Sequence, residues 1–203
     1  MLTRLRSALG ARRGGEPRTF LPLPNALQRR AEAARVAAAA AAGAGDDAAE
    51  PLRSELLLAD TSDLLHTSSL VLGIVCDECA ACCLTTASPH GEYFTSAGER
   101  LPAVQYFESV FADAAKDIAE LAATPGGLPT DTAARCGKSY RRCLRVLIHV
   151  LHAHAATPGG LTACGAMDVV SDAASLALKV ASARALVSEA ELAPLRSLLA
   201  AGK

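Results

Sequence analysis

Apolar side chains recur at helical spacing along the chain from residue 54 onward. The first series precedes a group of cysteines and consists of Leu56, Leu57, Leu58, Leu64, Leu65, Leu70, Val71 and Ile74. This spacing predicts a buried helix, with Asp60 or Thr61 as its N-terminal cap. A second helix is predicted after Pro102, a residue suited to a first helical turn. Its apolar series consists of Val104, Phe107, Val110, Phe111 and Ile118.

Three further helices are predicted in the C-terminal half of the chain. The first covers about residues 130–155 and lies between two copies of Ala-Thr-Pro-Gly-Gly-Leu, at 123–128 and 156–161. Because the flanking residues do not repeat, the copies predict two similar loops and not a helical repeat. Two more helices follow, and the last begins with the capping-box pattern Ser188-x-x-Glu191. The predicted fold class is all-α, a helical bundle with room for one small β-hairpin near Glu92-Tyr93-Phe94-Thr95.

The first 53 residues differ from the rest in composition. They contain several arginines and a low-complexity alanine run at 31–49, which predicts a flexible tail over 1–53 and a packed domain over 54–203. The expected location is the cytoplasm, with the nucleus as a second compartment. Because the arginine-rich start has no acid before Glu16, a mitochondrial transit peptide is the alternative.

Composition and charge exclude several classes of protein. Hydrophobic residues make up 51% of the chain but aromatic residues only 3%, so leucine, valine and alanine must fill the core. Such a core favours helices and argues against a β-sandwich. A net charge of −1 and a pI near 6.5 provide no overall field toward nucleic acid or an anionic membrane. The longest strongly apolar stretch, 64–76, is too short for a membrane span, so no transmembrane segment is expected.

The cysteines point to a metal site. The chain has seven, an odd number, and lacks a credible secretory signal, which argues against a disulfide framework. Four are crowded together: Cys76, Cys79, Cys82 and Cys83. Three histidines lie on the helix predicted at 130–155: His149, His152 and His154. Structural zinc uses four thiolate and imidazole ligands, so a Cys₂His₂ site joining the two segments is predicted.

Other chemistries fit these residues less well. Cys79-x-x-Cys82 is a redox spacing, but no βαβ pattern surrounds it. A zinc deaminase needs His-x-Glu in addition to Cys-x-x-Cys, and no histidine of this chain is followed by glutamate at that distance. On an ideal helix His149 and His152 diverge by about 60°, whereas His149 and His154 diverge by about 140°. Spacing alone therefore favours His149 and His152.

A cluster of arginines lies on the same predicted helix. The spacing places Arg141 and Arg145 on one face, with Arg142 about 100° away. Guanidinium groups keep their charge and bind phosphate in a bidentate manner, so the three could hold a phosphoserine or phosphothreonine. Without further information, the favoured interpretation is the simpler one, a solvated helix face.

Several segments together resemble the Mob family of kinase coactivators and adaptors. Arg142-Cys-Leu-Arg-Val-Leu-Ile-His-Val-Leu-His-Ala-His154 is similar to the family's most distinctive stretch, a basic pair, Leu/Phe-Arg-Val and a His-x-x-His-x-His tract. Asp60-Thr61-Ser62-Asp63 resembles its Asn/Asp-Thr-x-Asp motif, and Glu191-Leu-Ala-Pro-Leu195 resembles its C-terminal helix. The resemblance extends from residue 19 to residue 199.

The resemblance implies a Mob-type fold around a four-helix bundle, with a structural zinc and no catalytic activity. Its zinc histidines correspond to His149 and His154. This choice requires the helix to unwind near Pro158-Gly159-Gly160 and leaves His152 in the core or second shell of the site. The zinc cysteines of the family are four residues apart, whereas the shorter loop here selects Cys79 and Cys82, a spacing that zinc accepts. Cys83 or Cys76 could replace either one.

The implied function is binding. Family members engage the N-terminal regulatory segment of NDR/LATS-type AGC kinases, and a basic pocket takes a phosphorylated peptide from an upstream MST/Hippo-type kinase. By this resemblance, Arg141, Arg142 and Arg145 form the phosphopeptide pocket. Asp63 faces the kinase, although as a first-turn acid it could simply stabilise its helix.

Two features bear on how that function is carried out. Thr19 matches a phosphorylatable threonine of the family. The aromatic residues that the family has after Asp63 are leucines here, so an altered kinase-facing surface is expected. The alternatives are a Mob-type scaffold in a phosphatase or trafficking complex without kinase activation and, from another class, a metal-dependent or redox enzyme.

Overall fold

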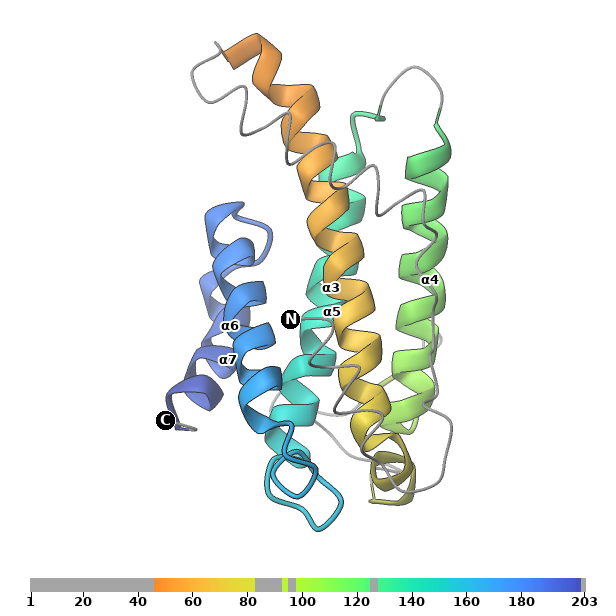
Figure 1. Ribbon diagram of the computed structural model, residues 1–203. Helices are drawn as coiled ribbons and strands as arrows, with labels where there is room; N and C mark the ends of the chain where they lie inside the picture. Colours follow the sequence, from red (N-terminus) through yellow and green to blue (C-terminus); the bar gives the residue numbers. More distant parts are fainter. Residues whose placement is uncertain (1–45, 83–92, 95–97, 125–127, 202–203) are drawn as a thin grey trace.

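The computed structural model describes residues 46–82, 93–94, 98–124 and 128–201 (Figure 1). Side chains are described for all of these except 46–52 and 82. Thr19 and Cys83 lie outside the described residues, as does most of the predicted tail.

The described part of the chain is helical throughout, which confirms the predicted fold class. It contains α3 (Asp46–Cys82), α4 (Ala103–Ala123), α5 (Thr132–Ala153), α6 (Met167–Ala183) and α7 (Glu189–Ala201), and no strand. In place of a hairpin there is one antiparallel bridge between Phe94 and Arg100. Beside it, the Leu101 amide donates a hydrogen bond of 2.8 Å to the Tyr93 carbonyl.

The N-terminus of α3 differs from the prediction. The helix begins at Asp46, inside the segment assigned to the tail, so neither Asp60 nor Thr61 caps it. Both side chains have other partners. The Thr61 hydroxyl donates to the Leu57 carbonyl one turn earlier (2.7 Å), and the Asp60 carboxylate accepts a hydrogen bond of 2.6 Å from Arg184 Nε. A polar side chain that has such a partner does not compete for the backbone groups of the helix, so it can lie in the helix interior.

The helices pack around α5, which contacts each of the other described helices. In Figure 1, α3 crosses in front of α5, α4 lies on one side of this pair, and α6 and α7 lie on the other. The segment Arg53–Ala81 of α3 is long and apolar enough to cross a membrane, but 78% of its most apolar window is buried in the bundle. That burial is what a core helix of a bundle requires.

The core is mainly aliphatic, as the composition predicts, with a few large rings at its centre. Phe107 and Phe111 of α4 and Tyr140 of α5 are almost completely buried. The Tyr140 hydroxyl donates to the Ala177 carbonyl at 2.9 Å, which ties α5 to α6. Burial also raises the pKa of Tyr140 above its ordinary value.

The connection from α6 to α7 is set by two local motifs. At the end of α6, the Leu186 amide donates to the Ala181 carbonyl (3.0 Å) and the Ala185 amide to the Ser182 carbonyl (3.2 Å), with Ala185 at φ 50°. This is a Schellman motif. At the start of α7, Ser188 and Glu191 form the predicted capping box. The Glu191 amide donates to Ser188 Oγ at 3.4 Å, and the Ser188 amide donates to Glu191 Oε2 at 3.4 Å.

Candidate metal centre and basic helix face

A buried group of thiolate and imidazole side chains lies where α3 and α5 end together. Cys79 of α3, His149 of α5 and His154 after α5 are each 0% exposed, and their ligand atoms all lie within 4.8 Å of one another. Cys79 Sγ is 3.3 Å from His149 Nε2, and the two imidazole centroids are 5.2 Å apart. This group could hold a metal ion.

His154 reaches the group because α5 ends before it, as predicted. The helix stops at Ala153, and His154 leaves helical geometry with φ −125° and ψ 12°. The following loop folds back so that the Leu161 amide donates to the His154 carbonyl at 2.8 Å. Only glycine fits at position 160, since a Cβ there would lie 2.0 Å from the His154 carbonyl oxygen. The Pro-Gly-Gly sequence is therefore part of what positions this histidine.

His152 is exposed, so its expected place in the core or second shell is wrong. It lies on α5 before the helix ends, only about 60° around the helix from His149, but the core does not cover this position. Spacing alone favoured the wrong pair, because it assumed that the helix continues through residue 154.

The surroundings of His149 suit a neutral ligand. Burial lowers its pKa to about 4, with a smaller contribution from His154 and His152. Burial also lowers the pKa of His154, against the attraction of Glu78. Tyr93 Oη lies 3.4 Å from His149 Nδ1, which leaves Nε2 facing Cys79. Metal-binding histidines need a neutral ring and a partner at the other nitrogen, and these residues therefore fit zinc.

The remaining cysteines differ in their relation to this group. Cys76 is buried one turn before Cys79 but is not part of the group. Cys82 is the last residue of α3, one turn beyond Cys79, and its side chain lies outside the described part. Among the described residues, three donors come together, and a fourth ligand from Cys82 stays a prediction.

The arginines of α5 divide between two neighbouring helices. Arg141 Nη1 lies 3.6 Å from Glu191 Oε1 of α7, whereas Arg142 Nη1 donates to Asp113 Oδ2 of α4 at 2.8 Å. Arg145 Nη1 donates to Tyr106 Oη at 3.2 Å. Arg141 and Arg145 line the same small cavity, as their predicted common face requires.

The sequence does not indicate which side chains contact these arginines. Glu191 belongs to a segment that resembles the Mob family and also to the capping-box pattern. Neither signal indicates a contact with an arginine. Asp113 carries no motif at all, and its contact depends on how α4 packs against α5.

Asp63 lies near the middle of α3 and not in its first turn, so the interpretation as a first-turn acid is wrong. Its side chain is half-buried. Leu64 and Leu65, which follow it, are only 4% and 2% exposed. These leucines therefore belong to the core and contribute almost nothing to a surface beside Asp63.

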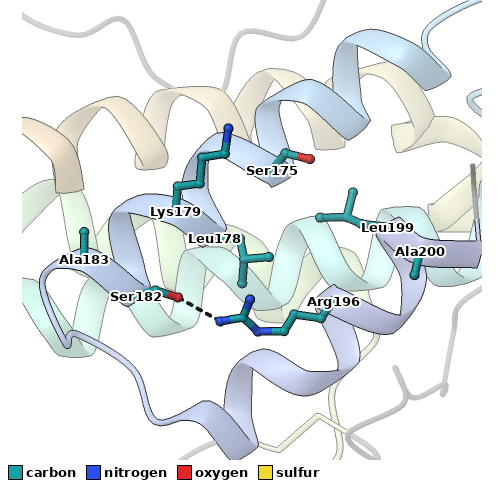
Figure 2. A pocket seen from close by; sticks show the side chains of 8 residues that line it. All are labelled: Ser175, Leu178, Lys179, Ser182, Ala183, Arg196, Leu199 and Ala200. Atoms are coloured by element: carbon teal, nitrogen blue, oxygen red, sulfur yellow. Dashed lines mark hydrogen bonds between the residues drawn. The ribbon is translucent and has the colours of Figure 1, made fainter.

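A wider groove lies between α6 and α7 (Figure 2). Its volume is about 720 Å³, and it is lined by Ser175, Leu178, Lys179, Ser182, Ala183, Arg196, Leu199 and Ala200. Figure 2 shows Arg196 directed toward Ser182, to whose hydroxyl it donates at 3.0 Å. Glu189 Oε2 accepts from the same guanidinium at 3.0 Å. No predicted site residue lines this groove. Its Arg196–Glu189 ion pair therefore provides matched control substitutions for the Arg141–Glu191 ion pair of the predicted site.

The described part of the chain is thus an all-helical bundle that combines a buried cysteine–histidine group, which could hold a metal ion, with arginines on its central helix. The chain matches the Mob1/phocein family over residues 53–194 and belongs to that family, a family of non-catalytic kinase coactivators and adaptors. A search of curated proteins finds no match to this chain.

Proposed function

We propose that the protein is an adaptor and activator of an NDR/LATS-type serine/threonine kinase. It would bind the regulatory segment of that kinase and a phosphorylated peptide from an upstream MST/Hippo-type kinase. The observation that carries the proposal is the cavity shared by Arg141 and Arg145 in a chain of the Mob1/phocein family.

Phosphopeptide binding is supported by the chemistry of this cavity. Two guanidinium groups on one face of α5 can each donate two parallel hydrogen bonds to a phosphate. The Arg141 side chain is 44% exposed and its ion pair is long, at 3.6 Å, so it can reorient toward a ligand. Arg142 is more firmly held by Asp113 and has a secondary role in this proposal.

A degenerate phosphothreonine peptide library, titrated calorimetrically, tests this site. Arg145→Ala should lower affinity by about tenfold or more, because each hydrogen bond to a charged group contributes about 1.5–3 kcal/mol. Arg196→Ala, which removes an arginine from the α6–α7 groove, should leave affinity unchanged. Equal affinities for all three proteins would mean that the arginines of α5 form only a solvated face.

The zinc of the proposed site is structural. Cys79, His149 and His154, with Cys82, would cross-link α3 to α5 at their shared end. Elemental analysis should find one zinc per chain, and strong chelation should lower the melting temperature. Cys82→Ser should lose zinc whereas Cys76→Ser should retain it; the reverse result would make Cys76 the ligand.

Asp63 is proposed as the kinase-facing acid. Because it lies inside α3, Asp63→Ala removes no first-turn acid, and a thermal melt recorded with each binding assay shows whether the variant is folded. Association with an NDR/LATS-type regulatory segment should be lost, while Glu108→Ala, an exposed acid on α4, should have no effect. If the wild-type protein binds no such segment, the activator proposal is wrong.

The burial of Leu64 and Leu65 favours a second candidate. Without exposed aromatic residues beside Asp63, the kinase-facing surface is small, and the chain could act as a Mob-type scaffold in a phosphatase or trafficking complex. Binding of phosphopeptide without binding of any kinase regulatory segment would support this candidate.

A further inference from the structure

A carboxylate already occupies the edge of the arginine cavity. The cavity has a volume of about 40 Å³ and is lined by Arg141, Leu144, Arg145, Ile148, Val187 and Glu191. Glu191 Oε1 lies 3.6 Å from Arg141 Nη1. The other lining residues are apolar, so among the described residues the charges at this cavity are two guanidinium groups and this one acid.

Glu191 is held at this place by its role in the capping box. Its Oε2 accepts a hydrogen bond of 2.8 Å from Ser188 Oγ, which fixes one oxygen and leaves Oε1 toward Arg141. The hydrogen bond from Ser188, and then the charges of Arg141 and Arg145, lower the pKa of Glu191. The carboxylate is therefore ionised at neutral pH and is present whenever a ligand approaches.

We propose that Glu191 is an internal competitor of the arginine site, which occupies Arg141 and repels an incoming anion. This inference rests on the proposed phosphopeptide binding. A peptide carboxylate has the same charge as Glu191, so exchanging one for the other gains little and brings two like charges together. A phosphate carries about −1.5 to −2 charges and three acceptor oxygens, so it can bind both arginines despite that repulsion. Glu191 thus weakens the binding of every anion, and a group needs the charge and the acceptor oxygens of a phosphate to overcome it.

The test compares two peptide libraries and three proteins. One library has a fixed phosphothreonine at its centre, and the other has glutamate at the same position. The proteins are the wild type, Glu191→Gln and Glu189→Gln, and affinity is measured by fluorescence polarisation at constant ionic strength. Glutamine at position 191 preserves the capping box, so α7 should still begin at the same residue.

In Glu191→Gln, affinity for the glutamate library should rise by about three- to tenfold, the effect expected from removing a partly exposed ion pair and a nearby like charge. Affinity for the phosphothreonine library should rise at least as much, because the carboxylate repels the greater charge of a phosphate more strongly. Glu189→Gln makes the same change in net charge on the same helix, but beside Arg196. It should leave both affinities unchanged.

Two results overturn the inference, and they are distinguishable. If the wild type binds the phosphothreonine library through Arg145 but Glu191→Gln raises neither affinity, or Glu189→Gln raises both equally, phosphopeptide binding stands and the role of Glu191 is wrong. If none of the three proteins binds either library, the proposed phosphopeptide site fails, and this inference fails with it.

Discussion

Replacing Gly160 by alanine should perturb the Cys79–His149–His154 group without replacing any of its three side chains. A Cβ at this position would lie 2.0 Å from the His154 carbonyl oxygen, 2.5 Å from Thr157 Oγ1 and 3.0 Å from the His154 carbonyl carbon. Ordinary contacts of a Cβ begin near 3.4 Å, so the backbone of His154 must move by roughly 1 Å or more. That movement carries the imidazole away from Cys79 and His149.

The expected cost has two parts. Overpacking of this kind costs about 1–3 kcal/mol, which lowers the melting temperature of a chain of this size by about 2–10 °C. Misplacing a ligand through its surroundings costs metal affinity by about 10–100-fold, the scale seen for residues that support metal ligands. Gly159→Ala is the matched control. Its Cβ would meet Glu78 Oε2 at 3.0 Å, the tip of a flexible side chain, so its effect should be small.

The measurements are zinc content, the rate of zinc transfer to a chelator, and thermal unfolding followed by circular dichroism. On a His154→Asn background, Gly160→Ala should cause no further loss of zinc, because the ligand through which it acts is already gone. Additional loss on that background, or wild-type zinc retention by Gly160→Ala alone, would show that the loop does not position His154.

Three further predictions concern stability. Gly137→Ala in α5 should raise the free energy of unfolding by about 0.5–1 kcal/mol, since the nearest atom to its Cβ would be a carbonyl oxygen at an ordinary 3.6 Å. Ala185→Gly should also raise the free energy of unfolding by about 0.5–1 kcal/mol, because alanine at φ 50° is strained. As a control, Ala119→Gly within α4 should lower it by about 1 kcal/mol. Denaturant titration measures all three variants. Burial raises the pKa of Cys136 to about 11 and of Cys143 to about 12, so above pH 9 unfolding releases protons and each thiol should cost about 1.4 kcal/mol of stability per pH unit. Denaturant titrations from pH 8 to pH 10.5 should show this slope, reduced in Cys143→Ala; an unchanged slope would mean that this thiol is not buried.

The central helix was the most predictable element. Its expected range of about 130–155 compares with the observed Thr132–Ala153, because a strong apolar period lies between two Pro-Gly-Gly sequences that stop helices. The choice between His152 and His154 was not accessible from periodicity. It depends on the loop that folds back onto the His154 carbonyl, and the approach at Gly160 that permits this is a tertiary contact. The resemblance to the Mob family selected the histidine that lies with Cys79 and His149, whereas spacing did not.

The start of α3 shows why local signals can mislead. Asp60 and Thr61 are good capping residues, but capping competes with every other partner that the fold offers. Asp60 binds Arg184, which is distant in sequence and comes close only when the turn after α6 packs against α3. The partners of the α5 arginines were hidden for the same reason, since Asp113 and Glu191 lie on two different helices.

The metal group and the arginine face are connected through aromatic side chains. Arg145 donates to Tyr106 Oη at 3.2 Å, the Tyr106 ring stacks on Tyr93 with centroids 4.6 Å apart, and Tyr93 Oη lies 3.4 Å from His149 Nδ1. Tyr93 comes from the segment between α3 and α4, so this stack joins three parts of the bundle at the end where zinc is proposed to bind. A metal that holds His149 would therefore also restrict, through Tyr93, the Tyr106 ring whose hydroxyl binds Arg145. In a core with few aromatic residues, two of the chain's three tyrosines lie in this connection, so a metal at the proposed site would support the proposed binding face as well as the fold.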